Sequence, residues 1–337
     1  MKYLLIGGAG FIGINFAKRI LENKDNVIIF DKFLRKGTKE NVEWLLSKYP
    51  NVEVVEGDIR YDTELLLEKI NDVEVVHHLA AQVAVTTSVA NPREDFEHNA
   101  LGTLNVCEAI RESKNKPILI YASTNKVYGE MSDVEIIQRG RRYEYKELIY
   151  GISEDTNLDF YSPYGCSKGA GDQYVRDYSR IYGLRTIVFR QSCIYGKRQF
   201  GIEDQGWVAW FTIASVLGKQ ITIYGDGMQV RDVLYVDDLF DAWELALKHI
   251  IKSCGQIYNI GGGPGMTMSL LELLSYLEEL LGEKIEIRYG NWRPGDQKIF
   301  VSSIRKVEKE LGWVPKISVK RGIAELFDWV QQNKNIF

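Results

Sequence analysis

The amino-acid sequence predicts an α/β fold, with a doubly wound parallel sheet followed by a smaller α/β lobe. In about the first 120 residues, short apolar runs alternate with segments of helical spacing, and after about residue 195 this alternation weakens. Alternation of this kind is typical of parallel strands in one sheet with helices on both faces. The chain has 337 residues, 45% of them hydrophobic, which is enough for one large unit and an appended lobe.

Each expected element of the larger unit has its own pattern: the strands are buried apolar runs, and the helices have apolar residues at helical spacing. The expected strands are 3–6, 26–30, 52–57, 73–79, 117–123 and 184–189. The expected helices are 11–23, 38–48, 62–71, 91–113 and 163–182. Asn91 and Pro92 suit the start of the fourth helix, because proline is favoured at the first helical position.

A polar, charged and aromatic segment, 131–160, interrupts the alternation. Loops of this length are usually functional lids or disordered. We interpret this one as a solvated excursion; the alternative is a cover over a ligand, formed through Arg139, Arg141 and Arg142. In the smaller lobe, short strands mix with helices. The strands are 221–225, 232–236, 256–262 and 284–290, and the helices 236–252, 268–281 and 303–311.

Composition argues against several classes of partner. The formal net charge is −4 and the pI is about 5.8, so no basic field suited to nucleic acid is expected. The four cysteines are scattered without a C-x-x-C motif, and the four histidines have no metal spacing. His77 and His78 are adjacent on an expected strand and should face opposite sides. No apolar run reaches the roughly 18 residues of a membrane span, and the N-terminus leads directly into a strand. We therefore expect a cytoplasmic protein with no metal, nucleic-acid or membrane partner.

A glycine-rich loop at residues 7–13 follows the first expected strand and opens the first helix. The glycines of its G-x-x-G-x-x-G spacing are Gly7, Gly10 and Gly13. They would let the backbone approach a pyrophosphate, whose charge the helix N-terminus favours. Asp31, about 20 residues on, can accept from a ribose diol and would repel a 2′-phosphate. The pattern predicts an NAD site, although Lys32 and Arg35 weaken the preference over NADP; a glycine turn without a ligand is the alternative.

Two further strand ends should lie at the same edge of the sheet. GDIR at 57–60 ends the third expected strand, and HLAAQ at 78–82 ends the fourth. In doubly wound sheets, ligands sit at the carboxyl ends of the strands. Asp58 could contact adenine, and Ala80 and Ala81 are small enough for a cofactor to lie across them. Taken singly, each could be ordinary strand-end sequence.

A redox site is indicated by Tyr164 and Lys168, which lie four residues apart on one face of an expected helix. A free tyrosine has a pKa of about 10, which a nearby ammonium and the positive nicotinamide would lower. The phenolate could then take a proton from a sugar hydroxyl that Thr124 holds by a hydrogen bond. Tyr-x-x-x-Lys alone is often coincidental, but here it accompanies a dinucleotide loop and a strand that ends in Ser123-Thr124.

Together these motifs resemble the extended short-chain dehydrogenases/reductases of the nucleotide-sugar epimerase/dehydratase group, over essentially the whole length. They occur in family order as GGAGFIG, Asp31, GDIR, HLAAQ, NALGT (99–103), Ser123-Thr124 and YGCSK (164–168). The runs that most resemble the subgroup acting at carbon 2 of CDP-hexoses are QVAVTTSVANP, STNKVYG, LDFYSPYGCSKGAGDQY, YGKRQF, DQGWVAWF and QVRDVL.

The resemblance implies an organisation and an assembly. Residues 1–190 would form a Rossmann domain that binds NAD and carries the insert 131–160. Residues 191–337 would bind the nucleotide sugar, and one strand–helix unit of this lobe would return to the main sheet. Helices 91–113 and 163–182 would pair across a two-fold axis in a homodimer or homotetramer.

The resemblance also implies roles for individual residues. The implied catalytic residues are Thr124, Tyr164 and Lys168. The implied NAD contacts are Gly7, Gly10, Phe11, Ile12, Gly13, Asp31, Lys32, Asp58, Ile59, Leu79, Ala80, Ala81, Gln82, Asn99, Ser123, Tyr164 and Lys168. The implied substrate contacts are Thr86, Ser88, Thr124, Asn125, Cys193, Gln205, Trp207, Tyr224, Gln229, Arg231, Arg293 and Asp296.

Several of these substrate contacts have structural alternatives. Arg231 and Arg293 match a diphosphate clamp, for which a planar guanidinium is suited, but each could form a surface salt bridge. Tyr224 could stack on a base or belong to the core, and Trp207 could serve packing. Thr86 and Ser88 could bind sugar hydroxyls or cap a helix. Cys193 departs from the asparagine of many 4-epimerases, so the sugar must be recognised differently.

The pair that follows Thr124 distinguishes the reactions of the group. Its 4,6-dehydratases have an acidic pair there, whereas this chain has Asn125 and Lys126. Dehydration is thereby disfavoured, while transient oxidation needs only a base, a hydrogen-bond donor and a retained cofactor. We expect NAD-dependent epimerisation at carbon 2 of a CDP-hexose, such as CDP-paratose or CDP-glucose. The alternatives are a UDP-sugar 4-epimerase, a decarboxylase or dehydratase and, outside catalysis, an NAD-binding regulatory module.

Overall fold

The chain passes more than once between two structural units in the computed structural model, which describes residues 1–293 and 295–337. The first unit comprises Met1–Val127, Ser162–Arg190 and Trp243–Tyr258. The second comprises Tyr128–Tyr161, Gln191–Ala242 and Asn259–Phe337. The insert 131–160, which we expected in the first unit, thus belongs to the second.

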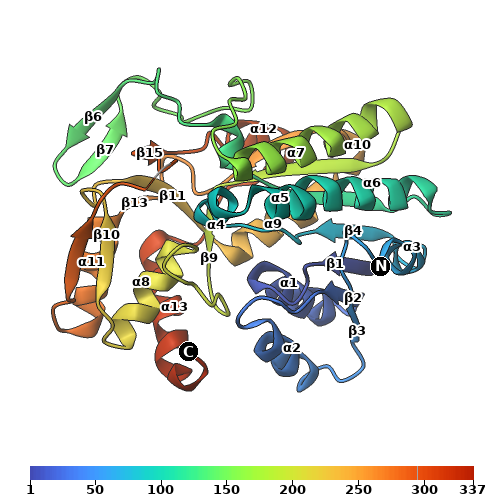
Figure 1. The fold of residues 1–337 in the computed structure, drawn as a ribbon, viewed down its shortest axis with the longest axis horizontal. Helices are drawn as coiled ribbons and strands as arrows, with labels where there is room; N and C mark the ends of the chain where they lie inside the picture. Colours follow the sequence, from blue (N-terminus) through green and yellow to red (C-terminus); the bar gives the residue numbers. More distant parts are fainter. Residues whose placement is uncertain (294) are drawn as a thin grey trace. The chain divides into compact units, whose positions relative to one another are not determined.

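The first unit is built on a seven-stranded sheet with the strand order β12-β8-β5-β4-β1-β2-β3. Figure 1 labels β4, β1, β2 and β3 of this sheet. Its strands are β1 (Lys2–Ile6), β2 (Asn26–Asp31), β3 (Glu53–Glu56), β4 (Val75–His78), β5 (Ile118–Thr124), β8 (Thr186–Gln191) and β12 (Ile257–Ile260). β1 pairs in parallel with both β2 and β4, so the chain reverses its winding direction there. The predicted doubly wound α/β fold is confirmed, and β12, from late in the sequence, forms one edge of the sheet.

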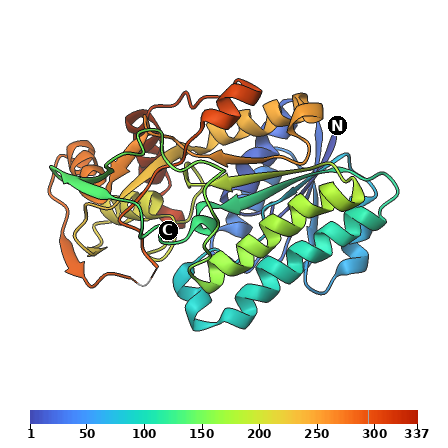
Figure 2. The ribbon, with the colours of Figure 1, turned by 90° about the horizontal axis from the view of Figure 1, so that it is seen from above.

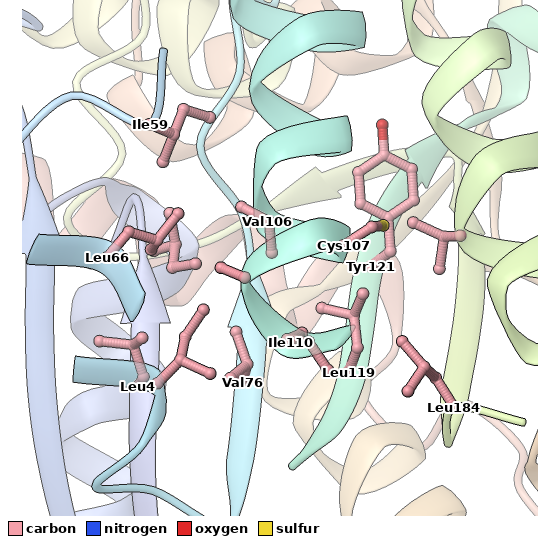
Figure 3. Packing of buried hydrophobic residues seen from close by; sticks show 14 of the residues in the cluster. Leu4, Ile59, Leu66, Val76, Val106, Cys107, Ile110, Leu119, Tyr121 and Leu184 are labelled. Carbon is pink, nitrogen blue, oxygen red and sulfur yellow. The ribbon is translucent and has the colours of Figure 1, made fainter. Parts of the chain in front are cut away.

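One face of this sheet is covered by helices that pack through aliphatic side chains. They are α3 (Thr63–Ile70), α6 (Gly102–Glu112) and α7 (Pro163–Tyr182). Figure 3 shows Leu66 of α3 and Val106 and Ile110 of α6 packed with Leu4 and Val76 of the sheet. α6 and α7 lie side by side (Figure 2). This face supports the long helix that carries Tyr164 and Lys168.

The opposite face has an aromatic cluster around His77. Its ring centroid lies 4.7 Å from those of Phe16 on α1 (Phe11–Glu22) and of Trp243 on α9 (Val236–Lys248). His78 points the other way, with Nε2 2.9 Å from Thr103 Oγ1 of α6. The two histidines therefore face opposite sides, as expected, and burial lowers the pKa of each to about 3. They are neutral packing groups at physiological pH.

The remaining helices of the first unit are short or interrupted. They are α2 (Thr38–Leu46), α4 (Val85–Ala90), α5 (Pro92–Phe96), the π-helical turn η1 (Glu97–Leu101) and α10 (Ile250–Ser253). The helix expected over 91–113 is thus divided into α5, η1 and α6. π-helical turns often occur at functional sites, and this one contains Asn99.

The second unit consists of small sheets and helices. Its strands are β6 (Ile136–Arg139), β7 (Arg142–Tyr145), β9 (Cys193–Tyr195), β10 (Ile221–Tyr224), β11 (Val230–Tyr235), β13 (Thr267–Ser269), β14 (Ile287–Gly290) and β15 (Ile299–Phe300). Its helices are α8 (Trp207–Val216), α11 (Leu270–Leu281), α12 (Arg305–Leu311) and α13 (Val319–Gln332). β11 pairs with β9, β13 and β15, so it organises the segments that carry the expected nucleotide-sugar contacts.

The insert 131–160 is not the solvated excursion that we preferred. Its strands β6 and β7 form an antiparallel hairpin. Tyr143 and Tyr145 pack against the buried Val230, Ile299 and Val301. Alternating aromatic residues give the hairpin an apolar face, and burial of that face is favourable. The charges of the segment alone did not indicate this burial.

Within the described ranges, no helix is both long enough and apolar enough to cross a lipid bilayer. The same residues contain no group of three or more His, Cys, Asp or Glu side chains that could hold a metal ion.

Candidate active site

The glycine loop lies where the winding of the sheet reverses. Gly7 follows β1 with a φ of 81°, and a Cβ on it would lie 2.5 Å from the backbone nitrogen of Ala80. That nitrogen itself donates to Ile6 O at 2.8 Å. Only glycine therefore lets the ends of β1 and β4 approach so closely. The crevice at the carboxyl ends of these strands, beside the start of α1, suits a pyrophosphate.

Asp31 is oriented by backbone donors around this loop. Its carboxylate accepts from the N–H of Ala9 at 3.0 Å and of Phe33 at 2.9 Å. Burial raises the pKa of Asp31, and these N–H groups oppose the rise. A carboxylate fixed beside the loop in this way fits the diol of a dinucleotide ribose.

Lys32 forms an ion pair with a carboxylate that it shares with a second cation. Its Nζ lies 2.9 Å from Asp58 Oδ2, and Arg60 bonds the same carboxylate. Burial raises the pKa of Asp58, but the hydrogen bonds from Arg60 and Lys32 outweigh it and hold that pKa well below its usual range. The charge of Lys32 is therefore already paired with Asp58. For this reason Lys32 attracts a 2′-phosphate less than its position in the sequence indicated, and the expected preference for NAD over NADP is weakened less.

Thr124, Tyr164 and Lys168 all belong to the first unit and are buried, with 7%, 9% and 3% of their surface exposed. Thr124 ends β5. Ser162 caps α7 by accepting from the N–H of Gly165 at 3.0 Å, so the helix begins one turn before Lys168. Lys168 Nζ donates to Ala122 O of β5 at 2.6 Å. The helix and the strand thereby hold the three side chains in one buried site.

Burial shifts the pKa values of both catalytic groups, because it penalises the charged form of either group. Burial raises the pKa of Tyr164 to about 12, although a hydrogen bond with Thr124 opposes the rise. Burial also lowers the pKa of Lys168 to about 7, opposed by Asp172 and Asp95. The expected lowering of the phenol pKa by the ammonium and the nicotinamide together stays a prediction.

The residues after Thr124 form a short 3₁₀ turn, η2 (Asn125–Tyr128). The N–H of Lys126 donates to Thr124 Oγ1 at 3.2 Å, and Thr124 Oγ1 lies 3.3 Å from Asn125 Oδ1. An amide and a cationic residue therefore stand next to the threonine, where a carboxylic acid would be needed to protonate a leaving hydroxyl.

Thr86 and Ser88, both on α4, have different environments. Ser88 is fully buried; its Oγ accepts from the N–H of Tyr164 at 3.1 Å and donates to Val85 O at 2.7 Å. It therefore connects α4 to the catalytic helix, and the substrate contact implied for it has no support here. Thr86 Oγ1 is buried and has no hydrogen-bond partner among the described residues, so it could bond a ligand hydroxyl.

The expected nucleotide-sugar contacts of the second unit include an aromatic–guanidinium pair. The Arg293 guanidinium carbon lies 3.7 Å from the ring centroid of Tyr224, and an Arg293 nitrogen lies 2.8 Å from Asp204 Oδ1. Arg231 pairs with Asp296 at 2.7 Å. Both arginines are thus ion-paired within the protein, and a diphosphate would exchange one anionic partner for another.

The other expected contacts of this unit include two packed side chains. Trp207 Nε1 donates to Cys193 Sγ at 3.0 Å, so the thiol orients the indole. Gln229 Nε2 donates to Tyr224 O, whereas its Oε1 is buried without a partner among the described residues. Gln205 forms a backbone bridge with Ile202.

The sequence analysis missed two groups of residues around Lys168. Asp172 lies four residues after Lys168; it accepts from Ser123 Oγ at 2.6 Å and from Arg190 at 2.9 Å. Its helical spacing from Lys168 could have indicated it. Asp95 accepts from Ser167, but no spacing in the sequence indicates that contact, because 72 residues separate the two.

Comparisons with known proteins agree with this geometry. A family model described as GDP-mannose 4,6 dehydratase matches residues 4–326. The chain is 44% identical to CDP-paratose 2-epimerase of Salmonella typhi, covering 98% of this chain and 99% of that protein. It superposes with a TM-score of 0.85 on UDP-glucose 4-epimerase of Thermotoga maritima, solved with UDP-glucose, at 31% identity and covering 99% and 100% of the two chains.

A UDP-glucose 4-epimerase of Thermus thermophilus, solved with NAD, gives a TM-score of 0.82 at 33% identity, covering 99% of this chain and 100% of the other. The chain therefore belongs to the GDP-mannose 4,6 dehydratase family of NAD-dependent nucleotide-sugar epimerases and dehydratases.

Proposed function

We propose that this protein is an NAD-dependent epimerase that inverts carbon 2 of a CDP-linked hexose. Membership of its family already supports an enzyme that acts on nucleotide sugars. The observation that carries the proposal is the combination of a buried Thr124, Tyr164 and Lys168 with a neutral and a cationic residue, Asn125 and Lys126, after the threonine. The Salmonella typhi relative, at 44% identity over nearly the whole chain, supports carbon 2 and cytidine.

NAD is the cofactor, and the first unit has the groups to hold it. The loop at Gly7 has no room for a Cβ, and Asp31 is oriented beside it. The nicotinamide supplies a hydride acceptor that returns the same hydride. The protein's own groups raise the pKa of Tyr164 to about 12, too high for a base at neutral pH, and the positive charge of the bound cofactor would favour the phenolate.

Tyr164 would take the proton of the carbon 2 hydroxyl, and Thr124 would hold that oxygen by a hydrogen bond. Lys168 would stabilise the phenolate. After the ketosugar presents its other face, Tyr164 would give the proton back. No proton on carbon is abstracted by the protein in this cycle, so no acidic pair after Thr124 is needed.

The deciding experiment is proton NMR of CDP-paratose and of CDP-glucose, each incubated with the protein and NAD in heavy water. We expect inversion at carbon 2 with the hydrogen at that carbon retained, because hydride returns internally. Tyr164→Phe should lose most turnover and still bind NAD, whereas a regulatory NAD-binding module would be unaffected. An unchanged carbon 2 in both sugars would contradict the assignment.

The second candidate is a UDP-sugar 4-epimerase. It is favoured by the 31% and 33% identities to UDP-glucose 4-epimerases of known structure. The same incubation with UDP-glucose distinguishes the two: inversion at carbon 4 would support this candidate, and its absence together with inversion at carbon 2 of a CDP-hexose would exclude it.

A further inference from the structure

A buried carboxylate that the proposed reaction does not use contacts the turn between the two catalytic side chains of α7. Asp95 on α5 is 1% exposed. Its Oδ2 accepts from Ser167 Oγ, and its Oδ1 accepts from Gln82 Nε2 at 2.9 Å and from Asn99 Nδ2 at 3.1 Å. Ser167 directly precedes Lys168, so this network joins the catalytic helix to the end of β4 and to η1.

The two amide groups orient one oxygen of this carboxylate. Burial raises the pKa of Asp95, and the hydrogen bonds from Ser167 and Gln82 and the charge of Lys168 oppose the rise. Gln82 Oε1 accepts from the N–H of Ala84, and Asn99 Oδ1 accepts from the N–H of Gln82 at 2.9 Å. Because each amide oxygen is engaged by the backbone, each NH₂ group must face Asp95. Oδ1 therefore acts only as an acceptor, and donation from the Ser167 hydroxyl to Oδ2 suits the ionised form of the carboxyl group.

Charge balance then links Asp95 to Lys168. Asp172, the other buried carboxylate nearby, forms two hydrogen bonds of 2.9 Å with Arg190, and that pair carries no net charge. By contrast, the side chains that donate to Asp95 are neutral, and Lys168 Nζ donates to a neutral carbonyl, that of Ala122. An isolated buried ion is costly, so two complementary charges in one buried site stabilise each other.

We propose that Asp95 is a counter-charge of Lys168, a positioning residue that favours the protonated lysine inside the catalytic site. The catalytic meaning of that charge rests on the proposed function, but the coupling between the two groups does not. Burial lowers the pKa of Lys168 to about 7, even though the Asp172 and Asp95 carboxylates partly oppose the drop. The same Asp95 charge also disfavours the phenolate of Tyr164, so it favours the protonated form of both members of the Tyr164/Lys168 pair.

Other charged or titratable groups face this pair from each packed element. They are His78 on β4, Tyr121 on β5, Asp172 on α7, Arg190 on β8, and Arg35 after β2, which acts on Tyr164. His78 has a pKa of about 3 and stays neutral near pH 7, and the pKa of Tyr121 is raised well above its ordinary value by burial. A proton lost near neutrality can therefore be assigned to Lys168.

Asp95→Asn removes the charge with little change of shape. The new amide oxygen can face Gln82 and Asn99, and its NH₂ group can donate to Ser167, whose hydroxyl is already 3.2 Å from Tyr164 O and can donate there. The measurement is a pH titration of the Lys168 ¹³Cε and ¹⁵Nζ shifts without substrate, with the signals assigned by their loss in Lys168→Met. We expect the midpoint of the Lys168 titration to move down by about one pH unit in Asp95→Asn. Glu94→Gln, an exposed carboxylate on the same helix, should leave it in place.

A Lys168 titration that is the same in Asp95→Asn and wild type would overturn the proposal, whatever the activity. If Asp95→Asn does not fold, the reciprocal measurement decides: the Asp95 carboxyl ¹³C titration should move to higher pH in Lys168→Met, and an unchanged titration would overturn the proposal. A lowered Lys168 titration in a protein that turns over no nucleotide sugar would support the coupling and contradict the proposed function. In an active protein, the alkaline limb of kcat/KM should move down in Asp95→Asn.

Discussion

At the scale of single residues, the buried lysine of the site lowers the stability of the fold. Lys168 is 3% exposed, and burial lowers its pKa from 10.5 to about 7. A lysine with a lowered folded pKa destabilises the protein most below about pH 7, and this penalty disappears as the pH rises toward 10.5. Functional sites commonly hold such destabilising groups.

Lys168→Met is therefore expected to abolish turnover and to raise the free energy of unfolding at pH 7 by on the order of 1–4 kcal/mol. The gain should shrink as the pH approaches 10. Urea unfolding at several pH values measures it, with the exposed Lys114→Met as the control. A variant less stable than wild type at pH 7 would show that the contacts of the lysine outweigh its desolvation.

At the scale of elements, the hairpin of the insert is expected to fold as part of the second unit. Arg142 of β7 donates to Glu272 at 3.2 Å and to Thr267 Oγ1, and its side chain is 25% exposed. Arg139 of β6 is 74% exposed and forms an ion pair with Glu144 of the same hairpin. The two arginines lie close together in the sequence, but Arg142 contacts other elements of the unit and Arg139 contacts its own hairpin.

Amides of the β6–β7 hairpin should be protected in hydrogen exchange, in line with those of β11. Arg142→Ala should speed hairpin exchange several-fold, because two anchoring contacts are lost, whereas Arg139→Ala should have little effect. If the hairpin amides of the wild-type protein exchange as fast as those of an unfolded peptide, the packed hairpin is contradicted and the insert is a solvated excursion.

At the scale of the whole molecule, exposed apolar side chains favour self-association. Tyr174 and Ile181 lie seven residues apart on α7 and are 45% and 66% exposed, and Phe96 of α5 is 56% exposed. Helices α5 and α7 pack on each other. Apolar groups spaced in this way on a soluble helix indicate an interface.

We expect a homodimer or a dimer of dimers, as the resemblance implied. Light scattering after size exclusion should give a mass that is a multiple of the 38.6 kDa chain. Tyr174→Glu combined with Ile181→Glu should reduce it to one chain. Ile251→Glu, at a position 99% exposed on α10, should not. A monomeric wild type would contradict this prediction.

Local patterns in the sequence determined the doubly wound sheet, the glycine loop with Asp31, and the order of Thr124, Tyr164 and Lys168. A strand, a turn and a helical spacing are each specified by residues close together in the chain, so sequence periodicity predicts them. The same holds for the opposite orientation of His77 and His78, which follows from the alternation of side chains along a strand.

Only the tertiary structure decided the rest, since it depends on contacts between distant segments. The charges of the insert indicated a solvated loop, but packing of Tyr143 and Tyr145 against β11 and β15 made it a hairpin. Burial, which no local pattern measures, raises the pKa of Tyr164 and lowers that of Lys168. Asp95 and Ser167 meet across 72 residues because α5 packs on α7, and only that packing brings a buried carboxylate to the turn before Lys168.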